Sequence, residues 1–372
     1  MTSIIYVGMD VHTTNYTLCC YSMEDDRFFA EVQVEPDAKN ILKYLARIEK
    51  QQSRDCRIVC GYEAGCLGYS LYHQLHAHGI DCVILAPTTM MTKPGKRIKT
   101  DRRDARLISK CLAFHTYSPV YIPTEVDDAV KEYIRMRDDA NSALARVKQQ
   151  IIAFCIRHGK IHDGKSYWTN KHLEWLSSLD LGNKILSEVL QEYLIRYYQL
   201  REQVDMYDMR INELAQAEPY RQKVEKLGCF RGIAAHTALS FCVEVGDFRR
   251  FATAQQFASY LGLVPGECSS GDKQQYTGIT KADNSHLRKL LVETAQVFGR
   301  SATKSGKSVA LKERQAKCDS LTVAYADKAN ARLKKKYFKI AMRSKVNIAK
   351  TAVAREMACF IWGMMTDNIS CA

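Results

Sequence analysis

The sequence lacks the features of a membrane or secreted protein. No apolar run reaches the roughly 18 residues that a membrane-spanning helix needs. The chain opens directly on Ile4-Ile5-Tyr6-Val7, with neither a basic stretch nor a small-residue cleavage site, so no secretory signal is expected. We therefore expect a cytoplasmic protein.

The cysteines lack the spacings of zinc sites and of disulfide frameworks. The chain has 14 of them, but no C-x-x-C pair occurs and no histidines flank cysteine pairs at zinc-ligand spacing. Most lie in apolar runs, such as Leu18-Cys19-Cys20-Tyr21. The pattern predicts buried free thiols that act as small hydrophobic side chains, in a reducing compartment.

What the sequence has in excess is positive charge. Its 372 residues carry 54 Lys and Arg against 41 Asp and Glu, a net charge of +13. Such an excess favours a polyanionic partner, because each neutralised phosphate releases counterions. A hydrophobic content of 46% with 26% charged residues is typical of a globular protein. The length allows two or three domains.

The first 120 residues show an α/β pattern. Short β-branched and aromatic runs predict strands, and apolar residues at helical spacing predict helices between them. The predicted order is β-β-β-α-β-α-β-α, that of the ribonuclease-H-like (RuvC-like) fold. The strands are expected at Ile4–Met9, Tyr16–Ser22, Phe28–Val34, Arg57–Tyr62 and Cys82–Leu85, and the helices at 38–50, Leu67–His78 and Asp101–Phe114.

The rest of the chain is predicted to be mainly helical, in two further units. Residues 121–217 carry two long helices, Glu125–His158 and Lys184–Gln216, which favour an antiparallel coiled coil; broken heptads leave an ordinary helical bundle as the alternative. Residues 218–372 form the third unit, with a Gly/Ser-rich loop at Pro265–Gly278, a helix at Ser285–Gly299 and a strongly basic segment that extends to Lys350.

Four acidic residues fall where a ribonuclease-H-like sheet would gather them. Asp10 ends the first predicted strand and Glu63 the fourth, and these strands are neighbours in that fold. Asp101 and Asp104 stand three residues apart at a helix start, which puts them on one face. Such a set can hold two divalent metals about 3.5–4 Å apart for phosphoryl transfer. Magnesium is expected, because it prefers oxygen ligands and retains water.

Each acid taken alone has an ordinary structural explanation. Asp10 fits an Asx turn at a strand end, Asp101 fits an N-cap, and Asp104 fits a first-turn acid that favours the helix dipole. The combination favours a nuclease-like site, since the cations around two of the acids suit a phosphate substrate. These cations are Lys96, Arg97, Lys99, Arg102, Arg103 and Arg106.

Several motifs together resemble one protein family. The run KTDRRDA, from Lys99 to Ala105, resembles a signature of the DEDD transposases of bacterial insertion sequences, which are related to Piv-type DNA invertases. Further motifs follow in the family's order, so that the resemblance covers almost the whole chain. They are Gly8–His12, Glu63–Tyr69, Phe257–Pro265, Ser269–Gly271, Gly278–Lys281 and Asn284–Arg288.

This resemblance implies a RuvC-like domain that holds the four acids as catalytic metal ligands, a coiled-coil insertion, and a C-terminal transposase domain with a serine. The family's serine attacks DNA and forms a covalent phosphoserine link. It maps onto Ser270, with Ser269 as the adjacent candidate. The resemblance also implies a structured guide RNA from the element that pairs with donor and target DNA. A serine distant from the acids must be brought to them, so a homo-oligomer (dimer or tetramer) is expected.

The residues around Ser270 do not by themselves identify a nucleophile. A Ser-Ser-Gly run in a loop is ordinary turn chemistry, and no His or Lys at fixed spacing marks an activating base. The role of Ser270 therefore depends on the resemblance alone.

Cations in and beyond these motifs are candidate nucleic-acid contacts. Tyr337 and Phe338 follow a lysine run, and aromatic residues among cations suit nucleic-acid backbones with stacked bases. The alternative is a solvated helix face whose apolar side, with Leu333, packs inward. The predicted nucleic-acid-binding residues are Lys99, Arg102, Arg103, Lys273, Lys281, Arg288, Lys334, Lys335 and Lys336.

Three other functions fit parts of the sequence. An actin-like ATPase would use the segment from Gly8 to Asn15 as a phosphate loop, but the second Gly-rich phosphate loop of that fold is missing. A RuvC-like nuclease with water as nucleophile and a non-catalytic nucleic-acid-binding protein remain as alternatives. A covalent protein–DNA adduct would separate the recombinase from both.

Overall fold

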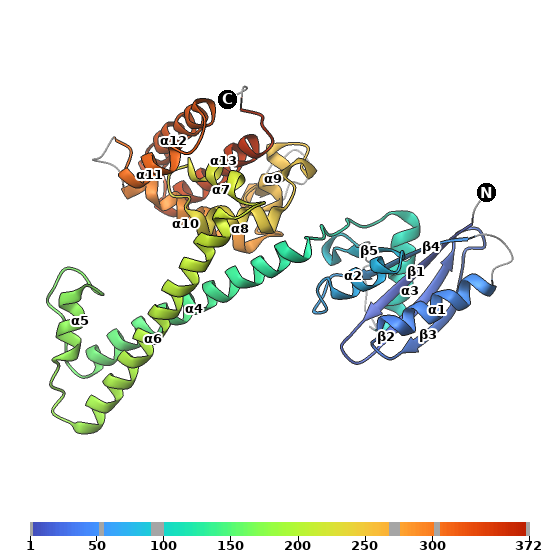
Figure 1. Cartoon of the computed structure of the whole chain (residues 1–372), viewed down its shortest axis with the longest axis horizontal. Helices are drawn as coiled ribbons and strands as arrows, with labels where there is room; N and C mark the ends of the chain where they lie inside the picture. Colours follow the sequence, from blue (N-terminus) through green and yellow to red (C-terminus); the bar gives the residue numbers. More distant parts are fainter. Residues whose placement is uncertain (1–2, 52–55, 91–99, 268–275, 301–305, 370–372) are drawn as a thin grey trace. The chain divides into compact units, whose positions relative to one another are not determined.

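The computed structural model describes residues 3–51, 56–90, 100–267, 276–300 and 306–369. The chain divides into two compact units, Met1–Ile122 and Pro123–Ala372 (Figure 1). Each unit has its own hydrophobic core, as expected for a chain of this length. The predicted units 121–217 and 218–372 both fall in the second compact unit, and their separation into domains remains a prediction.

The first unit is a five-stranded mixed sheet with helices on both faces. Strands β1, β2 and β3 form an antiparallel meander, and β4 and β5 run parallel to β1, in the spatial order β3-β2-β1-β4-β5. The order of strands and helices along the chain is the predicted one. The elements are β1 (Ser3–Val11), β2 (Tyr16–Ser22), β3 (Arg27–Val34), α1 (Ala38–Gln51), β4 (Cys56–Glu63), α2 (Ser70–Ala77), β5 (Asp81–Leu85), a 3-10 turn (Pro87–Thr89) and α3 (Asp101–Phe114).

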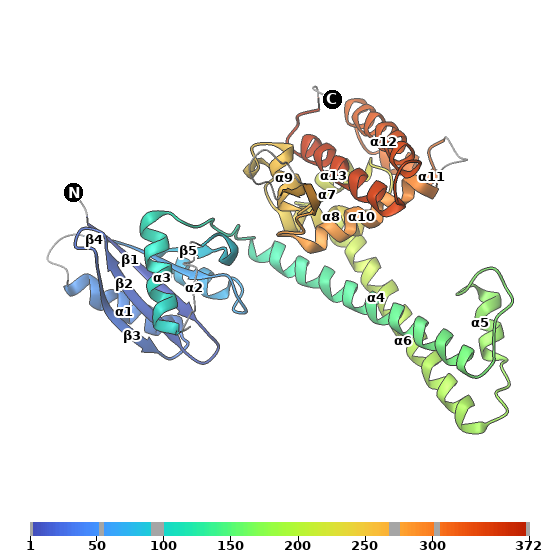
Figure 2. The ribbon, with the colours of Figure 1, turned by 180° about the vertical axis from the view of Figure 1, so that it is seen from behind.

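Successive residues of β1 are buried on opposite faces of this sheet. Ile5, Val7 and Met9 are buried in a core that includes α1 and α2. Tyr6, between them, is buried in a second core with Ile108 and other residues of α3. Successive strand residues point to opposite faces. Figure 1 shows α1 on one side of the sheet and Figure 2 shows α3 on the other.

The second unit begins with a long helical hairpin. Helix α4 (Glu125–Arg157) leads out, α5 (Asn170–Ser177) lies beyond it, and α6 (Lys184–Gln216) returns (Figures 1 and 2). Val130 and Ile134 near the start of α4 share a core with Ile211 near the end of α6, so the two helices pack antiparallel. The bounds of α6 are those predicted, whereas α5, between the two long helices, was not predicted.

The remainder of this unit is mainly helical, as predicted. Within the loop predicted at Pro265–Gly278, the described ends form a short antiparallel pair, β6 and β7. The elements are α7 (Arg221–Gly228), α8 (Ala235–Val245), a 3-10 turn (Phe248–Arg250), α9 (Ala254–Tyr260), β6 (Pro265–Glu267), β7 (Tyr276–Ile279), α10 (Ser285–Arg300), α11 (Val309–Gln315), α12 (Ser320–Ala341) and α13 (Val346–Met365).

The described cysteines have free thiols, and most of them are buried, as the sequence predicted. Burial raises the pKa of the Cys19 thiol to about 12 and that of Cys20 to about 11. These thiols therefore stay protonated and pack as hydrophobic groups. Among the described helices, none combines the length and apolar character required to cross a bilayer.

Candidate active site

Glycine at position 8 lets α3 lie directly on β1. A Cβ atom at Gly8 would stand 2.0 Å from the Ala105 carbonyl oxygen and 2.4 Å from the Ser109 amide nitrogen of α3. Asp10 is two residues further along the same strand, so its side chain lies on the face that α3 covers. Asp10 pairs with Thr17 of β2 inside the sheet, which rules out the Asx-turn explanation.

The start of α3 brings two more acids to this face. Thr100 takes the N-cap position and Asp101 is the first helical residue, so Asp101 is not the cap that the ordinary explanation required. Asp101 and Asp104 lie in the first turn, where carboxylates interact favourably with the helix dipole. The fully buried Ala105 that follows fixes this turn against β1.

These elements assemble a cluster of possible metal ligands. One ligand atom from each of Asp10, His12 and Asp101 lies within 4.8 Å of the other two. The His12 Nε2 atom is 3.2 Å from Asp10 Oδ2. Burial raises the pKa of the Asp10 carboxyl and nearby Asp101 and Asp104 raise it further, whereas His12 lowers it. A bound cation would relieve this repulsion, so the residues fit a divalent metal.

His12 ends the motif Gly8–His12, but the sequence pattern predicted no role for it. The sequence did offer a signal that His12 lies near Asp10, because residues two apart in an extended segment point to the same side. Position 12, directly after β1, therefore shares the side of Asp10.

Glu63 lies on the neighbouring strand but outside this group of three. It is the last residue of β4, and the parallel register that pairs Gly8 with Gly61 places it beside Asp10. A Cβ atom at Gly61 would meet the Leu112 side chain of α3, so position 63 belongs to the same face. The Glu63 side chain is exposed, and its carboxylate is not among the ligand atoms gathered within 4.8 Å.

The predicted cations near the acids differ in their surroundings. Arg102 and Arg103 are exposed on α3 beside the acidic turn. Arg106 forms an ion pair with Glu31 of β3 and lies over the Phe28 ring, so its charge is partly used within the fold. Lys96, Arg97 and Lys99 lie outside the described residues.

Ser270, Ser269 and Lys273 also lie outside the described residues, but the base of their loop is well defined. The Thr280 amide donates to the Val264 carbonyl oxygen at 3.0 Å, and the Lys281 amide donates to Gly262 at 3.1 Å. Arg288 donates to the Leu261 and Ala282 carbonyl oxygens at 3.0 and 2.8 Å. Part of the donor capacity of Arg288 is therefore structural, and its predicted contact with nucleic acid remains a prediction.

The predicted basic segment covers the second half of α12 and the start of α13. Leu333 is fully buried, in agreement with the expected apolar side of the helix, and Lys335 on the other side is exposed. The Lys336 ammonium group lies 2.6 Å from a Glu356 carboxylate oxygen of α13. Lys336, one of the predicted nucleic-acid contacts, is thus already paired within the protein.

A second cluster of titratable groups lies in the second unit, Pro123–Ala372, and the sequence pattern did not predict it. His286, at the start of α10, contacts Asp138 of α4 at 2.8 Å and Glu244 of α8 at 3.2 Å. Arg135 pairs with Glu244 at 3.0 Å, and His236 lies 2.9 Å from Asp138. His286 lies in the motif Asn284–Arg288, but its partners Glu244 and Asp138 are 42 and 148 residues away in the sequence.

The ion pairs of this second cluster stabilise the charged side chains by more than burial destabilises them. Burial opposes ionisation of all three central groups. Nevertheless, the carboxylates of Asp138 and Glu244 raise the pKa of His286 to about 9. His286 and Arg135 in turn lower the pKa of Glu244 to about 2, and His236 and His286 hold the pKa of Asp138 far below its usual range. Asp138, Glu244 and His286 therefore stay ionised, and their ion pairs connect α4 to α8 and α10.

Comparison with known proteins identifies the family. Residues 7–156 match the model of the IS110-type DEDD transposases, and residues 225–314 match the transposase IS116/IS110/IS902 family. "Putative transposase y4qE" of Sinorhizobium fredii is 35% identical over 82% of this chain and 75% of its own length. The transposase for insertion sequence element IS1533 of Leptospira borgpetersenii is 32% identical over 90% of this chain and 95% of its own length. The chain belongs to the IS116/IS110/IS902 family and is a DNA transposase, an enzyme of phosphoryl transfer.

Proposed function

We propose that this transposase cuts and rejoins DNA strands with a divalent-metal site at Asp10, Glu63, Asp101 and Asp104 and with Ser270 as nucleophile. The observation that supports it most is the convergence of Asp10, His12 and Asp101 where α3 begins on β1. Carboxylates drawn from elements far apart in the chain are what a metal-dependent phosphoryl transferase requires.

Magnesium is the proposed ion, because all four proposed ligands are carboxylates, and Mg²⁺ prefers oxygen ligands. When bound, the metal would stabilise the charge that develops on the phosphate oxygens. Within the chain, His12 orients the Asp10 carboxylate through their 3.2 Å contact. Arg102 and Arg103, exposed beside the acidic turn, bind the phosphates that flank the reacting one.

The proposed chemical step is a transesterification. The Ser270 hydroxyl oxygen forms a bond to phosphorus, a strand oxygen leaves, and the proton of the hydroxyl passes to the leaving oxygen. The reverse reaction with the hydroxyl of another strand end rejoins the DNA and releases the serine. No phosphodiester bond is lost, so exchange needs no external energy source.

The proposed partners are donor DNA, target DNA and a structured guide RNA from the element, bound by a homo-oligomer. The net charge of +13 and the exposed lysine-rich side of α12 support binding of polyanions. The RNA and the serine chemistry rest on the family resemblance. We also propose that the two long helices of the second unit, α4 and α6, form the coiled-coil insertion that the family resemblance implies.

A covalent-adduct assay tests this function. The protein is incubated with DNA, RNA and Mg²⁺, and the adduct is isolated under denaturing conditions and mapped by mass spectrometry. We expect a phosphate on Ser270, no adduct from Ser270→Ala, and nearly unchanged nucleic-acid binding by that variant.

Ser269→Ala is the matched control and is expected to retain the adduct. A link mapped to Ser269 would move the role by one residue. Metal-dependent cleavage without any adduct would indicate a nuclease that uses water, and binding without cleavage would indicate a non-catalytic nucleic-acid-binding protein.

A further inference from the structure

The far end of the helical hairpin contains a small cavity. It lies between the end of α4, the connecting segment 158–169 and α5, and its volume is about 120 Å³. An apolar cavity of about 150 Å³ holds one benzene molecule, so this cavity has the size for a single flat ring. It is open to solvent, because two of its lining side chains are largely exposed: Ile161 at 72% and Tyr167 at 44%.

Four aromatic side chains form a continuous wall of this cavity. The ring centre of His162 lies 4.8 Å from that of His172 and 5.0 Å from that of Trp175. The ring centre of Tyr167 lies 5.0 Å from that of His172. Aromatic side chains at an open surface are what unpaired nucleobases stack on, and this stacking tolerates any base because every base has a flat face.

The two histidines of the wall add a polar contact without adding charge. The Trp168 amide donates to His172 Nδ1 at 3.1 Å, so this nitrogen carries no proton. Burial lowers the pKa of His172, and the neighbouring His162 lowers it further. Among the described residues, the buried His162 Nδ1 atom has no hydrogen-bond partner. A buried nitrogen without a partner is destabilising, and the polar edge of a base can supply the missing hydrogen bond.

The charge around the cavity is positive. Lys160 lines it, and Lys165 and Lys171 are exposed in the same part of the chain. Residues 157–177 carry four basic and two acidic side chains, a net charge of +2. Positive charge disfavours an organic cation, which is another ligand that aromatic side chains bind. It favours the phosphate groups on either side of a nucleobase.

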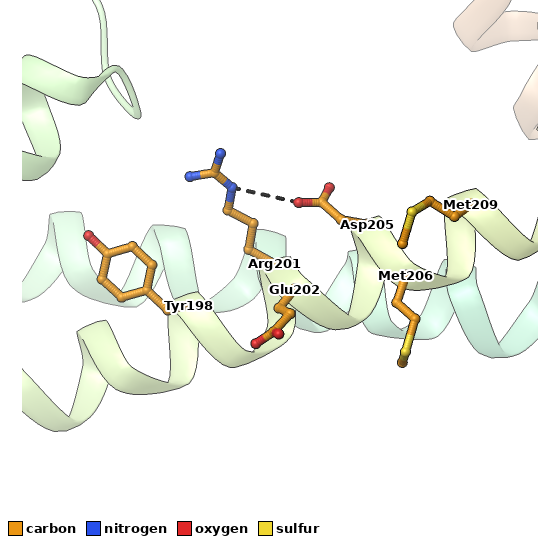
Figure 3. A pocket seen from close by; sticks show the side chains of 6 residues that line it. All are labelled: Tyr198, Arg201, Glu202, Asp205, Met206 and Met209. Atoms are coloured by element: carbon orange, nitrogen blue, oxygen red, sulfur yellow. Dashed lines mark ion pairs between the residues drawn. The ribbon is translucent and has the colours of Figure 1, made fainter.

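A larger hollow on α6 has the opposite charge and does not suit a nucleic acid. Its volume is about 520 Å³, and Tyr198 is its one aromatic lining residue (Figure 3). Arg201 lies 3.9 Å from Asp205, and Glu202 adds a second carboxylate. One positive and two negative side chains repel phosphate. The cavity at the end of the hairpin combines several rings with positive charge, and the hollow on α6 does not.

We infer that the cavity at the end of the hairpin binds one unpaired nucleobase of a nucleic acid, with Lys160 on an adjacent phosphate. A base inside a duplex has both faces covered by its neighbours and would have to be flipped out to enter. The ligand is therefore a single-stranded segment or an unpaired base in a loop. The inference extends the proposed function and takes from it only that this transposase binds nucleic acid.

Quenching of Trp175 fluorescence tests this site, because a base stacked on the aromatic wall changes that signal. The full chain carries Trp168→Phe and Trp362→Phe, which leave Trp175 as its one tryptophan. The probes are oligouridylate, oligothymidylate and a DNA duplex of equal length, at low salt and without metal. We expect the single strands to quench the fluorescence and the duplex to have little effect. Tighter binding of one single strand would identify RNA or DNA as the source of the base.

Substitutions at the cavity separate stacking from charge. Tyr167→Ala should weaken binding of the single strands at least about fivefold, the loss expected for one stacked base, whereas Tyr167→Phe keeps the ring and should bind normally. Tyr198→Ala is the matched control, because Tyr198 is exposed to 45% but lies outside the cavity. Lys160→Gln should reduce the slope of log affinity against log salt by up to about 0.7. Circular dichroism should show equal helix content for all variants.

Several outcomes would overturn the inference. These are no quenching by either single strand, equal quenching by the duplex, or equal affinity in Tyr167→Ala and the wild type. Quenching by tetramethylammonium but not by oligonucleotides would assign the cavity to an organic cation instead. If Tyr167→Ala does not fold, an unchanged salt slope in Lys160→Gln overturns the inference by itself. None of these measurements involves Ser270, so a failed adduct assay would not affect them.

Discussion

Raising the pH from about 6.5 to about 10 should destabilise the second unit, because His286 loses its proton. Its ordinary pKa of 6.5 is raised to about 9 by Asp138 and Glu244. Below 6.5 the imidazole is charged in both the folded and the unfolded chain, and its stabilising contribution is complete. As the pH rises through 9 the folded protein loses this proton as well, and the contribution disappears.

The difference between 6.5 and about 9 corresponds to about 3 kcal/mol in the free energy of unfolding. The His286 side chain is only 19% exposed, so solvent screens little of this interaction. At the acidic end, Glu244 has a pKa of about 2, below its ordinary 4.5. Its contribution is present above 4.5 and is lost as the pH falls through 2. The network is therefore fully effective between about 4.5 and 6.5.

Trp362 offers a reporter for this unit. The chain has three tryptophans, and replacing Trp168 and Trp175 with phenylalanine leaves Trp362, whose indole nitrogen donates to the Phe251 carbonyl oxygen at 3.1 Å. Urea unfolding is followed by its fluorescence at pH 6.5 and 10, with His286→Gln as the variant that cannot titrate. We expect this variant to be less stable at pH 6.5 and to lose about 3 kcal/mol less than the wild type between the two pH values. Equal losses in both proteins would refute the reasoning.

Three further changes have defined outcomes. Gly8→Ala should lower the stability of the first unit by about 3 kcal/mol in chemical unfolding, because the new Cβ meets the α3 backbone; Gly278→Ala, with open space around it, should change little. Asp101→Asn should weaken Mg²⁺ binding in calorimetry while Tm stays equal or rises, since one repelling charge is removed; unchanged binding would contradict the metal site. Neutralising Lys334, Lys335 and Lys336 of α12 together should weaken DNA binding and reduce its salt slope by up to about three; an unchanged slope would show that these lysines make no phosphate contact.

Much of the fold follows from local pattern. The alternation in β1 and the helical spacing in α6 depend on residues close in sequence, and both elements were predicted at or near their observed bounds. The start of α2 was predicted too early, at Leu67, because Gly68 adopts a positive φ of 56° and delays the helix to Ser70. The short strands β6 and β7 were missed, since three or four residues give too little alternation to recognise.

The residues of the candidate site could be predicted only where the order of strands and helices along the chain determines which of them lie side by side. Asp10 and Asp101 could be placed together because a ribonuclease-H-like order brings β1 to the helix after β5, and the structure brings them together. The pairing of His286 with Asp138 across 148 residues depends on how α10 packs on α4, which no local pattern encodes. The same holds for Glu63, whose distance from the other acids depends on side-chain placement at the end of β4.

The placement of Asp101 on α3 also sets when the site can form during synthesis. Asp10 leaves the ribosome 91 residues before Asp101. At about 5–20 residues per second this interval is roughly 5–20 s. Until α3 is complete, the sheet has one uncovered face, with Gly8 and Gly61 bare and with Asp10 lacking its Asp101 neighbour. A nascent or truncated chain that stops before α3 therefore lacks Asp101 and the cluster, so the proposed metal site of this transposase can assemble only after its first unit is synthesised and folded.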